Sequence, residues 1–124
     1  MKLDPNKDIL IDMDNLNEDF RKHPLLFYRY SQKYAILSRK HDDLKENMKQ
    51  IRSMEYVRIK REIGKISDKN TEAEVDVSEL VIASRNEMLE ARQEMDILKG
   101  FVEALRMKKD AMIQISANQR AEDK

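Results

Sequence analysis

Residues 30–51, YSQKYAILSRKHDDLKENMKQI, carry the pattern that decides the fold. Apolar or aromatic side chains recur in this stretch at alternating spacings of four and three residues, with one polar interruption at His41. The repeat consists of Tyr30, Tyr34, Leu37, His41, Leu44, Met48 and Ile51. A 4-3 repeat is typical of a helix that buries one face in a coiled-coil seam. We therefore predict a long helix here, in which His41 helps to fix the register.

The predicted helix extends in both directions from the repeat. No proline follows Pro24, and no glycine precedes Gly64, so we expect the helix to run from residue 24 to about residue 66. We expect a short helix, capped by Asp12 or Asp14, to end at about Lys22, where Pro24 stops it and begins the next helix. Residues 1–12 are predicted to form a mobile or docked arm.

A second apolar seam indicates a second long helix. One set of positions recurs every seven residues, and a second set follows four residues behind it. These positions are Val77, Ser84, Ala91, Leu98, Leu105, Met112, Val81, Met88, Met95 and Val102. Residues 71–74, TEAE, fit the capping-box pattern, so we expect the helix to begin there, with Asp76 or Ser78 as the alternative start. We expect it to end at about Asn118.

These elements predict an all-α fold: a long antiparallel helical hairpin of two long helices plus a short N-terminal helix. We divide the chain into an arm and short helix over 1–23, a hairpin over 24–118 and a frayed tail over 119–124. A bare hairpin would leave Phe101, Leu105, Met112 and Ile115 facing water, so we expect assembly into an oligomeric helical ring or bundle. The residues predicted to mediate oligomerisation are Leu98, Phe101, Val102, Leu105, Met112 and Ile115. A different helical partner would also cover this surface.

The composition agrees with long helices and excludes several classes of protein. The 124 residues include 24 Lys and Arg, 24 Asp and Glu, two glycines, two prolines and no cysteine. So few chain breakers argue against sandwiches, barrels and βαβ folds. No apolar run is long enough to span a membrane, and no signal core is evident, so we expect a cytoplasmic protein without membrane contacts.

The zero net charge conceals two oppositely charged segments. Residues 33–65 carry ten basic and five acidic side chains, a net charge of +5. Residues 66–103 carry four basic and ten acidic side chains, a net charge of −6. Such segments can hold antiparallel helices together, or they can attract a charged partner.

The sequence lacks the residue patterns of the common catalytic and metal sites. There is no glycine-rich phosphate loop, and no Glu-x-x-His pair for a di-metal site in a helical bundle. His23 and His41 stand alone, and Ser31 and Ser38 have no base and orienting group beside them. We therefore predict a protein that is not an enzyme and that uses no metal or cofactor.

The densest cluster of positive charge suggests contact with nucleic acid. Lys and Arg side chains at this density can neutralise phosphates and give salt-sensitive binding that tolerates many sequences. The candidate DNA-binding residues are Lys45, Lys49, Arg52, Arg58, Lys60, Arg61, Lys65 and Lys69. Tyr56 is the only aromatic nearby that a base can stack on. The alternative is that these cations pair with acids of the third helix such as Glu87, Glu90 and Glu94.

Several short segments resemble the UvsY family of phage recombination mediator proteins. Two of the segments lie in the first long helix: Lys40–Lys45 through Ile51, and Val57–Lys60. A third, Lys69–Ala73, is similar to the K-x-T-E-A turn of phage proteins of this group. The last is Val102-x-x-Leu105-Arg106 in the final helix. The resemblance implies a non-enzymatic protein that binds single-stranded DNA as a ring of six or seven subunits. It also implies two protein partners, a RecA-like recombinase and the single-strand-binding protein that the recombinase displaces. A phage-encoded protein of this kind would act in the host cytoplasm.

A basic motif of that family, K-A-R-L-D-Y-Y, contributes to DNA binding. Its first lysine falls on Lys60 and its leucine on Ile63, whereas its tyrosine pair falls on Lys65 and Ile66. Stacking at those positions is therefore lost, and phosphate contacts are expected to carry the binding. The alternative interpretations are a coiled-coil adaptor or a phage structural or assembly protein that does not bind nucleic acid.

Overall fold

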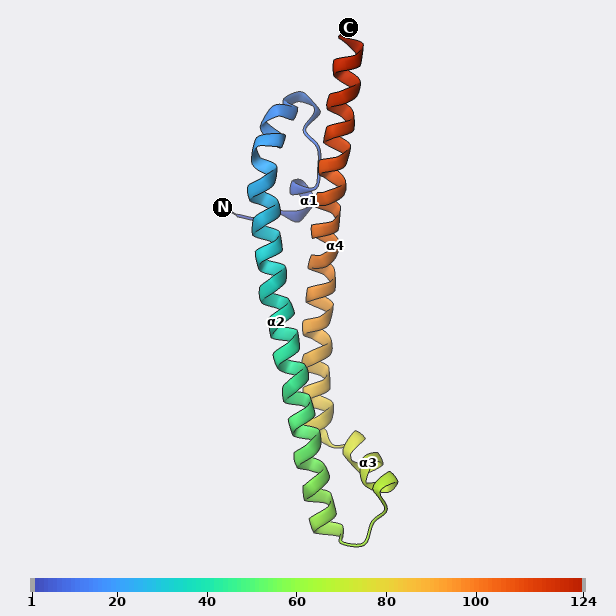
Figure 1. Ribbon diagram of the computed structural model, residues 1–124. Helices are drawn as coiled ribbons and strands as arrows, with labels where there is room; N and C mark the ends of the chain where they lie inside the picture. Colours follow the sequence, from blue (N-terminus) through green and yellow to red (C-terminus); the bar gives the residue numbers. More distant parts are fainter. Residues whose placement is uncertain (1, 124) are drawn as a thin grey trace. The chain divides into compact units, whose positions relative to one another are not determined.

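A computed structural model describes residues 2–123, and all of the secondary structure in this range is helical (Figure 1). Two helices dominate: α2 (Leu16–Ile63) with 48 residues and α4 (Glu79–Glu122) with 44. The shorter elements are α1 (Pro5–Asp8), a 3-10 turn at Met13–Asn15 and α3 (Asp68–Asp76). The predicted all-α class with two long helices is confirmed.

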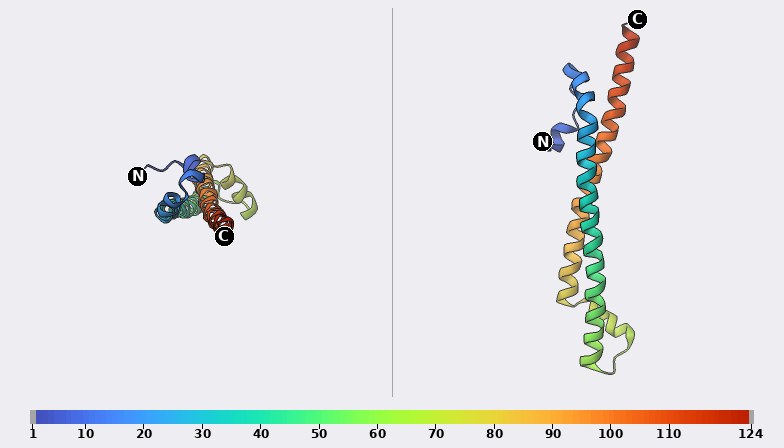
Figure 2. Two further views of the ribbon diagram at one scale, coloured as in Figure 1. Left: turned by 90° about the horizontal axis from the view of Figure 1, so that it is seen from above. Right: turned by 60° about the vertical axis from the view of Figure 1, so that its left-hand side comes forward.

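The chain divides into two compact units, which are described separately. The terminal unit combines Met1–Ala35 with Asp96–Lys124, and the central unit is Ile36–Met95. Within each unit a stretch of α2 runs antiparallel to a stretch of α4 (Figure 1). Figure 2 shows α3 as a separate short helix between the end of α2 and the start of α4 in the central unit.

The expected break at Pro24 is wrong, because α2 continues through this residue. Proline inside a helix removes a backbone donor and crowds the preceding turn. Here His23 and Leu26, on either side of Pro24, are both buried. Two contacts tie the same stretch of α2 to α4: Asp19 pairs with Lys108, and the Arg106 guanidinium lies 5.7 Å from the centre of the Phe27 ring. Packing on both sides of the proline therefore holds the helix together.

Helix α2 ends three residues before the predicted end at about residue 66. Helix α2 ends at Ile63, and Gly64 follows with a φ of 78°. Its backbone N–H donates to the Lys60 carbonyl at 3.1 Å. Glycine adopts this left-handed conformation without the steric penalty of a side chain, and it commonly ends helices for that reason.

The capping box predicted at Thr71 is wrong, because α3 begins three residues earlier. Ser67 is the N-cap, and its hydroxyl accepts a 3.2 Å hydrogen bond from the Asn70 backbone N–H. Thr71 lies inside α3 and donates its own hydroxyl to the Ser67 carbonyl at 2.9 Å. The second long helix starts at Glu79, directly after the alternative start Ser78.

The second seam is largely buried: Met88 and Met95 are half-buried, and Val77 is exposed. Ser84, Ala91, Leu98, Leu105 and Met112 are all buried, as their spacing of seven predicts. Val77 is exposed because it lies in the turn between α3 and α4. The expected helix end near residue 118 is also wrong, because α4 continues to Glu122.

The N-terminal arm is docked in the terminal unit. The Tyr30 hydroxyl donates to the Asp8 carboxylate at 2.6 Å, and Lys108 Nζ donates to the Asp8 carbonyl at 2.9 Å. The prediction that Leu105 and Met112 face water in a single chain is wrong, because both are fully buried. The predicted two-helix hairpin did not include the docked arm, which contacts both long helices through Tyr30 and Lys108.

The four other residues predicted to mediate oligomerisation divide into two groups. Leu98 and Val102 are buried within the chain, whereas Phe101 and Ile115 are partly exposed. Phe101 and Ile115 are therefore the members of the set with apolar surface left for a second copy.

The core of the central unit joins α2, α3 and α4. Ile59, Val75 and Val81 form one buried cluster, one residue from each helix. Ile51, Tyr56 and Ile66 pack against it. The cluster fixes α3 against the C-terminal part of α2, where the candidate DNA-binding residues lie.

Candidate nucleic-acid interface

All eight predicted DNA-binding residues belong to the central unit. Six of them lie on α2, Lys65 lies in the loop that follows, and Lys69 lies in the first turn of α3. The whole set therefore lies in one unit of the fold. Its members differ in the helix face that they occupy and in whether they form ion pairs.

Four of the cations share one face of α2. Lys45, Lys49, Arg52 and Lys60, together with Tyr56, are spaced by four, three, four and four residues. Side chains three or four positions apart are neighbours on a helix surface. We call these five residues the cationic stripe. Its aromatic member is Tyr56, the residue identified in the sequence as able to stack on a base.

Asp68 of α3 binds both Lys60 and Tyr56. Lys60 Nζ lies 2.8 Å from the Asp68 carboxylate and 2.8 Å from the Ile66 carbonyl, and the Tyr56 hydroxyl donates to Asp68 at 2.8 Å. The ammonium group also lies 5.8 Å from the centre of the Tyr56 ring. The hydrogen bond to Asp68 raises the pKa of Lys60, and the hydrogen bonds from Lys60 and Tyr56 lower the pKa of Asp68. This pair is therefore charged at neutral pH.

Asp76 of α3 holds Arg52 in the same way. Arg52 Nη1 lies 2.6 Å from the Asp76 carboxylate. Arg85 of α4 approaches the same carboxylate at 3.8 Å. Two carboxylates of one short helix thus neutralise two members of the cationic stripe.

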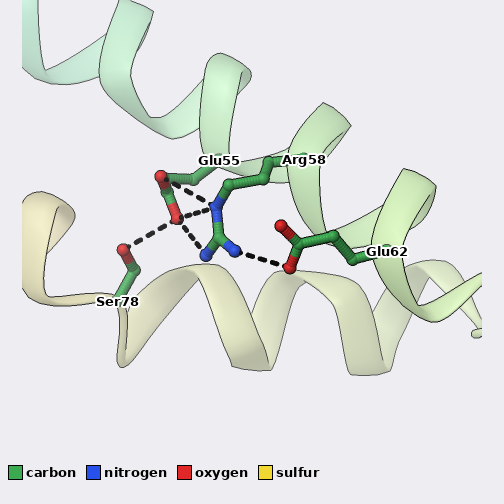
Figure 3. Close-up of polar contacts among 4 residues, drawn as sticks. All are labelled: Glu55, Arg58, Glu62 and Ser78. Atoms are coloured by element: carbon green, nitrogen blue, oxygen red, sulfur yellow. Dashed lines mark hydrogen bonds and ion pairs between the residues drawn. The ribbon is translucent and has the colours of Figure 1, made fainter.

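Arg58 lies two positions from both Tyr56 and Lys60, and therefore on another face of α2. Figure 3 shows its guanidinium between two glutamates of the same helix. Its guanidinium binds Glu55 at 2.7 Å and Glu62 at 2.8 Å. The Glu55 side chain is only 6% exposed, and it also accepts a 3.0 Å hydrogen bond from the Ser78 hydroxyl. The hydrogen bond from Arg58 lowers the pKa of Glu55, so its charge is kept in spite of burial. Because Arg58 satisfies a buried carboxylate, it is poorly placed to bind phosphate.

Four of the predicted cations are both exposed and without an ion pair in the described part of the chain. Lys45, Arg61, Lys65 and Lys69 form no ion pair with any residue in the range 2–123. Lys49 pairs with Glu46 at 3.3 Å, but both side chains are largely exposed. Solvent-exposed pairs of this kind contribute little and are easily replaced. These residues are therefore the cations most available to a phosphate backbone.

The alternative of pairing with the third helix is wrong for the three glutamates named for it, although Asp76, which lies in the range expected for that helix, does bind Arg52. Glu87, Glu90 and Glu94 of α4 are exposed and form no ion pair with α2 within the described part of the chain. The neutralising acids come instead from α2 itself and from α3. The spacing of Asp68, Glu72 and Asp76 by four residues was a signal in the sequence that could have identified α3 as this source.

The histidines and acids show no arrangement for metal chemistry. Over residues 2–123, no three His, Cys, Asp or Glu side chains are grouped closely enough to hold a metal ion. His41 Nδ1 lies 3.6 Å from the neighbouring Asp42. Within the same range, no helix has the length and apolar character needed to cross a membrane.

The fold is similar to that of the recombination mediator protein UvsY of bacteriophage T4. One crystal structure of that protein gives a TM-score of 0.80 at 15% sequence identity, with 97% of this chain and 93% of that chain covered. A second crystal form gives a TM-score of 0.82 at 13% identity with the same coverage. The sequence matches no protein-family model and no curated protein. The resemblance noted in the sequence therefore holds at the level of the fold.

Proposed function

We propose that this chain is a non-enzymatic recombination mediator that binds single-stranded DNA. The observation that carries the proposal is the fold similarity to a phage recombination mediator over 97% of the chain. In this proposal the protein helps a RecA-like recombinase assemble on DNA covered by single-strand-binding protein. As a phage protein it would act in the cytoplasm of the host cell.

The charge distribution supports DNA as the ligand. Arg61, Lys65 and Lys69 are exposed and unpaired within residues 2–123, and they cluster where α2 ends and α3 begins. The cationic stripe lies on the same part of α2 and adds Lys45 and Lys49. We propose that the exposed cations make the first phosphate contacts. Arg52, Tyr56 and Lys60 then form a second group of contacts beside them.

We also propose that the active form is a homo-oligomer of six or seven subunits. Several large apolar side chains on the two long helices are exposed in the single chain, including Ile36, Met54, Leu89 and Ile97. Phe101 and Ile115 add partly exposed apolar surface. A ring would cover such surface and would repeat each DNA contact, so weak single sites would combine into tight binding.

One observation favours an alternative function as a coiled-coil adaptor or phage structural or assembly protein without nucleic-acid binding. Arg52, Arg58 and Lys60 already bind carboxylates of the same chain. If these pairs persist in the assembly, the positive charge serves the fold rather than a ligand.

Binding of a fluorescein-labelled oligo(dT) strand, followed by fluorescence anisotropy over a salt series, tests the proposal. The test variant carries Arg61→Ala, Lys65→Ala and Lys69→Ala. Loss of three phosphate contacts should weaken binding and reduce the slope of log K against log[salt] by roughly two units. No binding at low salt by the unaltered protein would exclude DNA as the ligand and leave the adaptor function.

A matched control separates a local site from a general effect of charge. The control variant carries Lys99→Ala, Lys109→Ala and Arg120→Ala, which removes the same charge from exposed positions of α4. It should retain most of the affinity and the slope. Equal losses of affinity in both variants would show that the DNA site does not lie where α2 ends and α3 begins. Light scattering with and without the oligonucleotide reports the oligomeric state in the same samples.

A further inference from the structure

Helix α3 presents a row of carboxylates to the cationic stripe. Asp68, Glu72 and Asp76 are spaced by four residues, so they lie on one face of α3, about 6 Å apart along its axis. Asp68 contacts Lys60 and Tyr56, and Asp76 contacts Arg52. Glu72 lies between them and lines a surface pocket together with Arg52 and Tyr56. The three acids therefore face Arg52, Tyr56 and Lys60 along the length of α3.

The body of α3 is fixed while its acidic face remains accessible to water. Thr71 and Val75 are buried, and Val75 belongs to the cluster with Ile59 and Val81. By contrast, the Asp68 side chain is 80% exposed and the Asp76 side chain is 54% exposed. Ion pairs with such exposed partners are weak in water. A competing anion can therefore replace the carboxylates without unfolding the helix.

We propose that the acidic face of α3 occupies the cationic stripe in place of a nucleic-acid backbone and is displaced there by single-stranded DNA. The inference rests on the proposed DNA binding and adds a regulatory contact to it. DNA first meets the exposed cations Lys45, Arg61, Lys65 and Lys69. Its phosphates then replace the Asp68 and Asp76 carboxylates on Lys60 and Arg52, which also frees the Tyr56 ring for a base. Helix α3 stays anchored through Thr71 and Val75 during this exchange.

This arrangement predicts a particular salt dependence. In the unaltered protein each DNA contact with Arg52 or Lys60 must break an ion pair with α3, and this pair is strongest at low salt because salt screens exposed charges. Removing the α3 carboxylates removes this competition, so the affinity should rise most at low salt. The α3 acids thus weaken binding most at low salt.

The test variant replaces the acidic face by neutral side chains of the same shape: Asp68→Asn, Glu72→Gln and Asp76→Asn. Its binding to labelled oligo(dT) is compared with that of a control variant that carries Glu87→Gln, Glu90→Gln and Glu94→Gln. Both variants gain the same net charge, but the control acids are exposed and unpaired with α2 within the described residues. At low salt the test variant should bind about three- to tenfold more tightly than the control. Its salt slope should be steeper than that of the control, because the competing α3 ion pairs, which salt weakens, are absent.

The outcomes separate this inference from the proposed function. If the unaltered protein binds DNA and both variants gain equal affinity, the α3 acids act only through net charge and the inference fails while the function stands. If none of the three proteins binds at low salt, the proposed function fails as well. If only the test variant binds, the acidic face of α3 blocks the site more strongly than proposed, and the inference is supported.

A second variant is needed because Asp68 lies in the first turn of α3, where its replacement could destabilise the helix. Asp76→Asn alone removes a carboxylate from the last turn of α3, where negative charge is unfavourable for the helix. This single change should raise DNA affinity, and it should have no effect in a protein that also carries Arg52→Ala. An equal gain in both backgrounds would show that the Arg52–Asp76 contact is not what DNA displaces.

Discussion

The Tyr30 hydroxyl donates a 2.6 Å hydrogen bond to the carboxylate of Asp8, a residue 22 positions earlier in the chain. Tyr30 is 1% exposed, and burial together with this hydrogen bond raises its pKa above the ordinary range for tyrosine. The same carboxylate accepts a 3.0 Å hydrogen bond from the Asp4 backbone N–H. One buried phenol thus anchors the N-terminal arm to the first part of α2.

Removing this hydroxyl should destabilise the terminal unit. We expect Tyr30→Phe to lower the free energy of unfolding by about 1–2 kcal/mol, because a charged acceptor loses its side-chain donor. Urea unfolding followed by circular dichroism measures the change. Tyr28→Phe is the matched control, since Tyr28 is 59% exposed and should change stability by less than about 0.5 kcal/mol. Equal stability of the two variants would contradict the arm contact.

Lys108 is predicted to be a second anchor of the arm. Its side chain is 2% exposed, and Nζ binds the Asp8 carbonyl at 2.9 Å and the Asp19 carboxylate at 3.2 Å. Asp19 keeps a hydrogen bond from the Asp12 backbone N–H, which compensates part of its charge. We therefore expect Lys108→Met to cost about 2–4 kcal/mol of unfolding free energy. The adjacent Lys109→Met, at an exposed position, should change it little.

A second measurement on the same pair of variants distinguishes a released arm from general destabilisation. Amide hydrogen exchange should speed up over residues 4–15 in Lys108→Met before it changes in α4. Uniform faster exchange along the whole chain would show that Lys108 supports the helix pair rather than the arm.

The buried faces of the long helices could be predicted from the sequence because helical periodicity is a local property. Ser84, Ala91 and Leu98 are buried where their spacing of seven placed them, although Ser84 is polar and Ala91 is small. The docked arm could not be predicted in this way. Its contacts with Tyr30 and Lys108 join residues far apart in the sequence, and no periodic pattern predicts such contacts.

The position of the basic cluster could be predicted from the sequence, but the ion pairing of its cations could not. Clustering of Lys and Arg identified the C-terminal part of α2 as strongly basic. The partners of those cations depend on where α3 begins, and the Thr71 capping box placed the N-cap four residues too late. With Ser67 as the true cap, Asp68 and Asp76 fall within α3 beside Lys60 and Arg52. A shift of about one helical turn therefore decided which cations are free.

Pro24 gives a direct test of how packing overrides local preference. The residue lies inside α2, where it removes one backbone donor. Pro24→Ala should restore a helical hydrogen bond and raise the free energy of unfolding by about 1–3 kcal/mol, reduced by the greater freedom of the unfolded chain. Thermal and urea unfolding measure the gain. A loss of stability would show that the proline ring itself makes contacts that alanine cannot replace.

His23 should make stability depend on pH. The residue is 5% exposed, and neither ring nitrogen has a hydrogen-bond partner within residues 2–123. Burial lowers its pKa in the folded protein, and Lys108 and Lys109 of α4 lower it further, against a smaller opposing effect of Asp19 on α2. The unfolded chain therefore binds a proton at His23 more readily than the folded protein does.

The sign of the effect follows from this difference. In the unfolded chain the histidine pKa is about 6.5, so stability should be unaffected above about pH 7 and should fall as the pH drops below that value. Urea midpoints measured between about pH 8 and pH 5 should decrease for the unaltered protein and decrease less for His23→Leu. His41→Gln is the control and should retain the decrease, since His41 contacts only its neighbour Asp42 among the ion pairs described. If His23→Leu loses stability with the same steepness as the unaltered protein, another group that titrates in this range causes the acid sensitivity, and the buried imidazole is not its source.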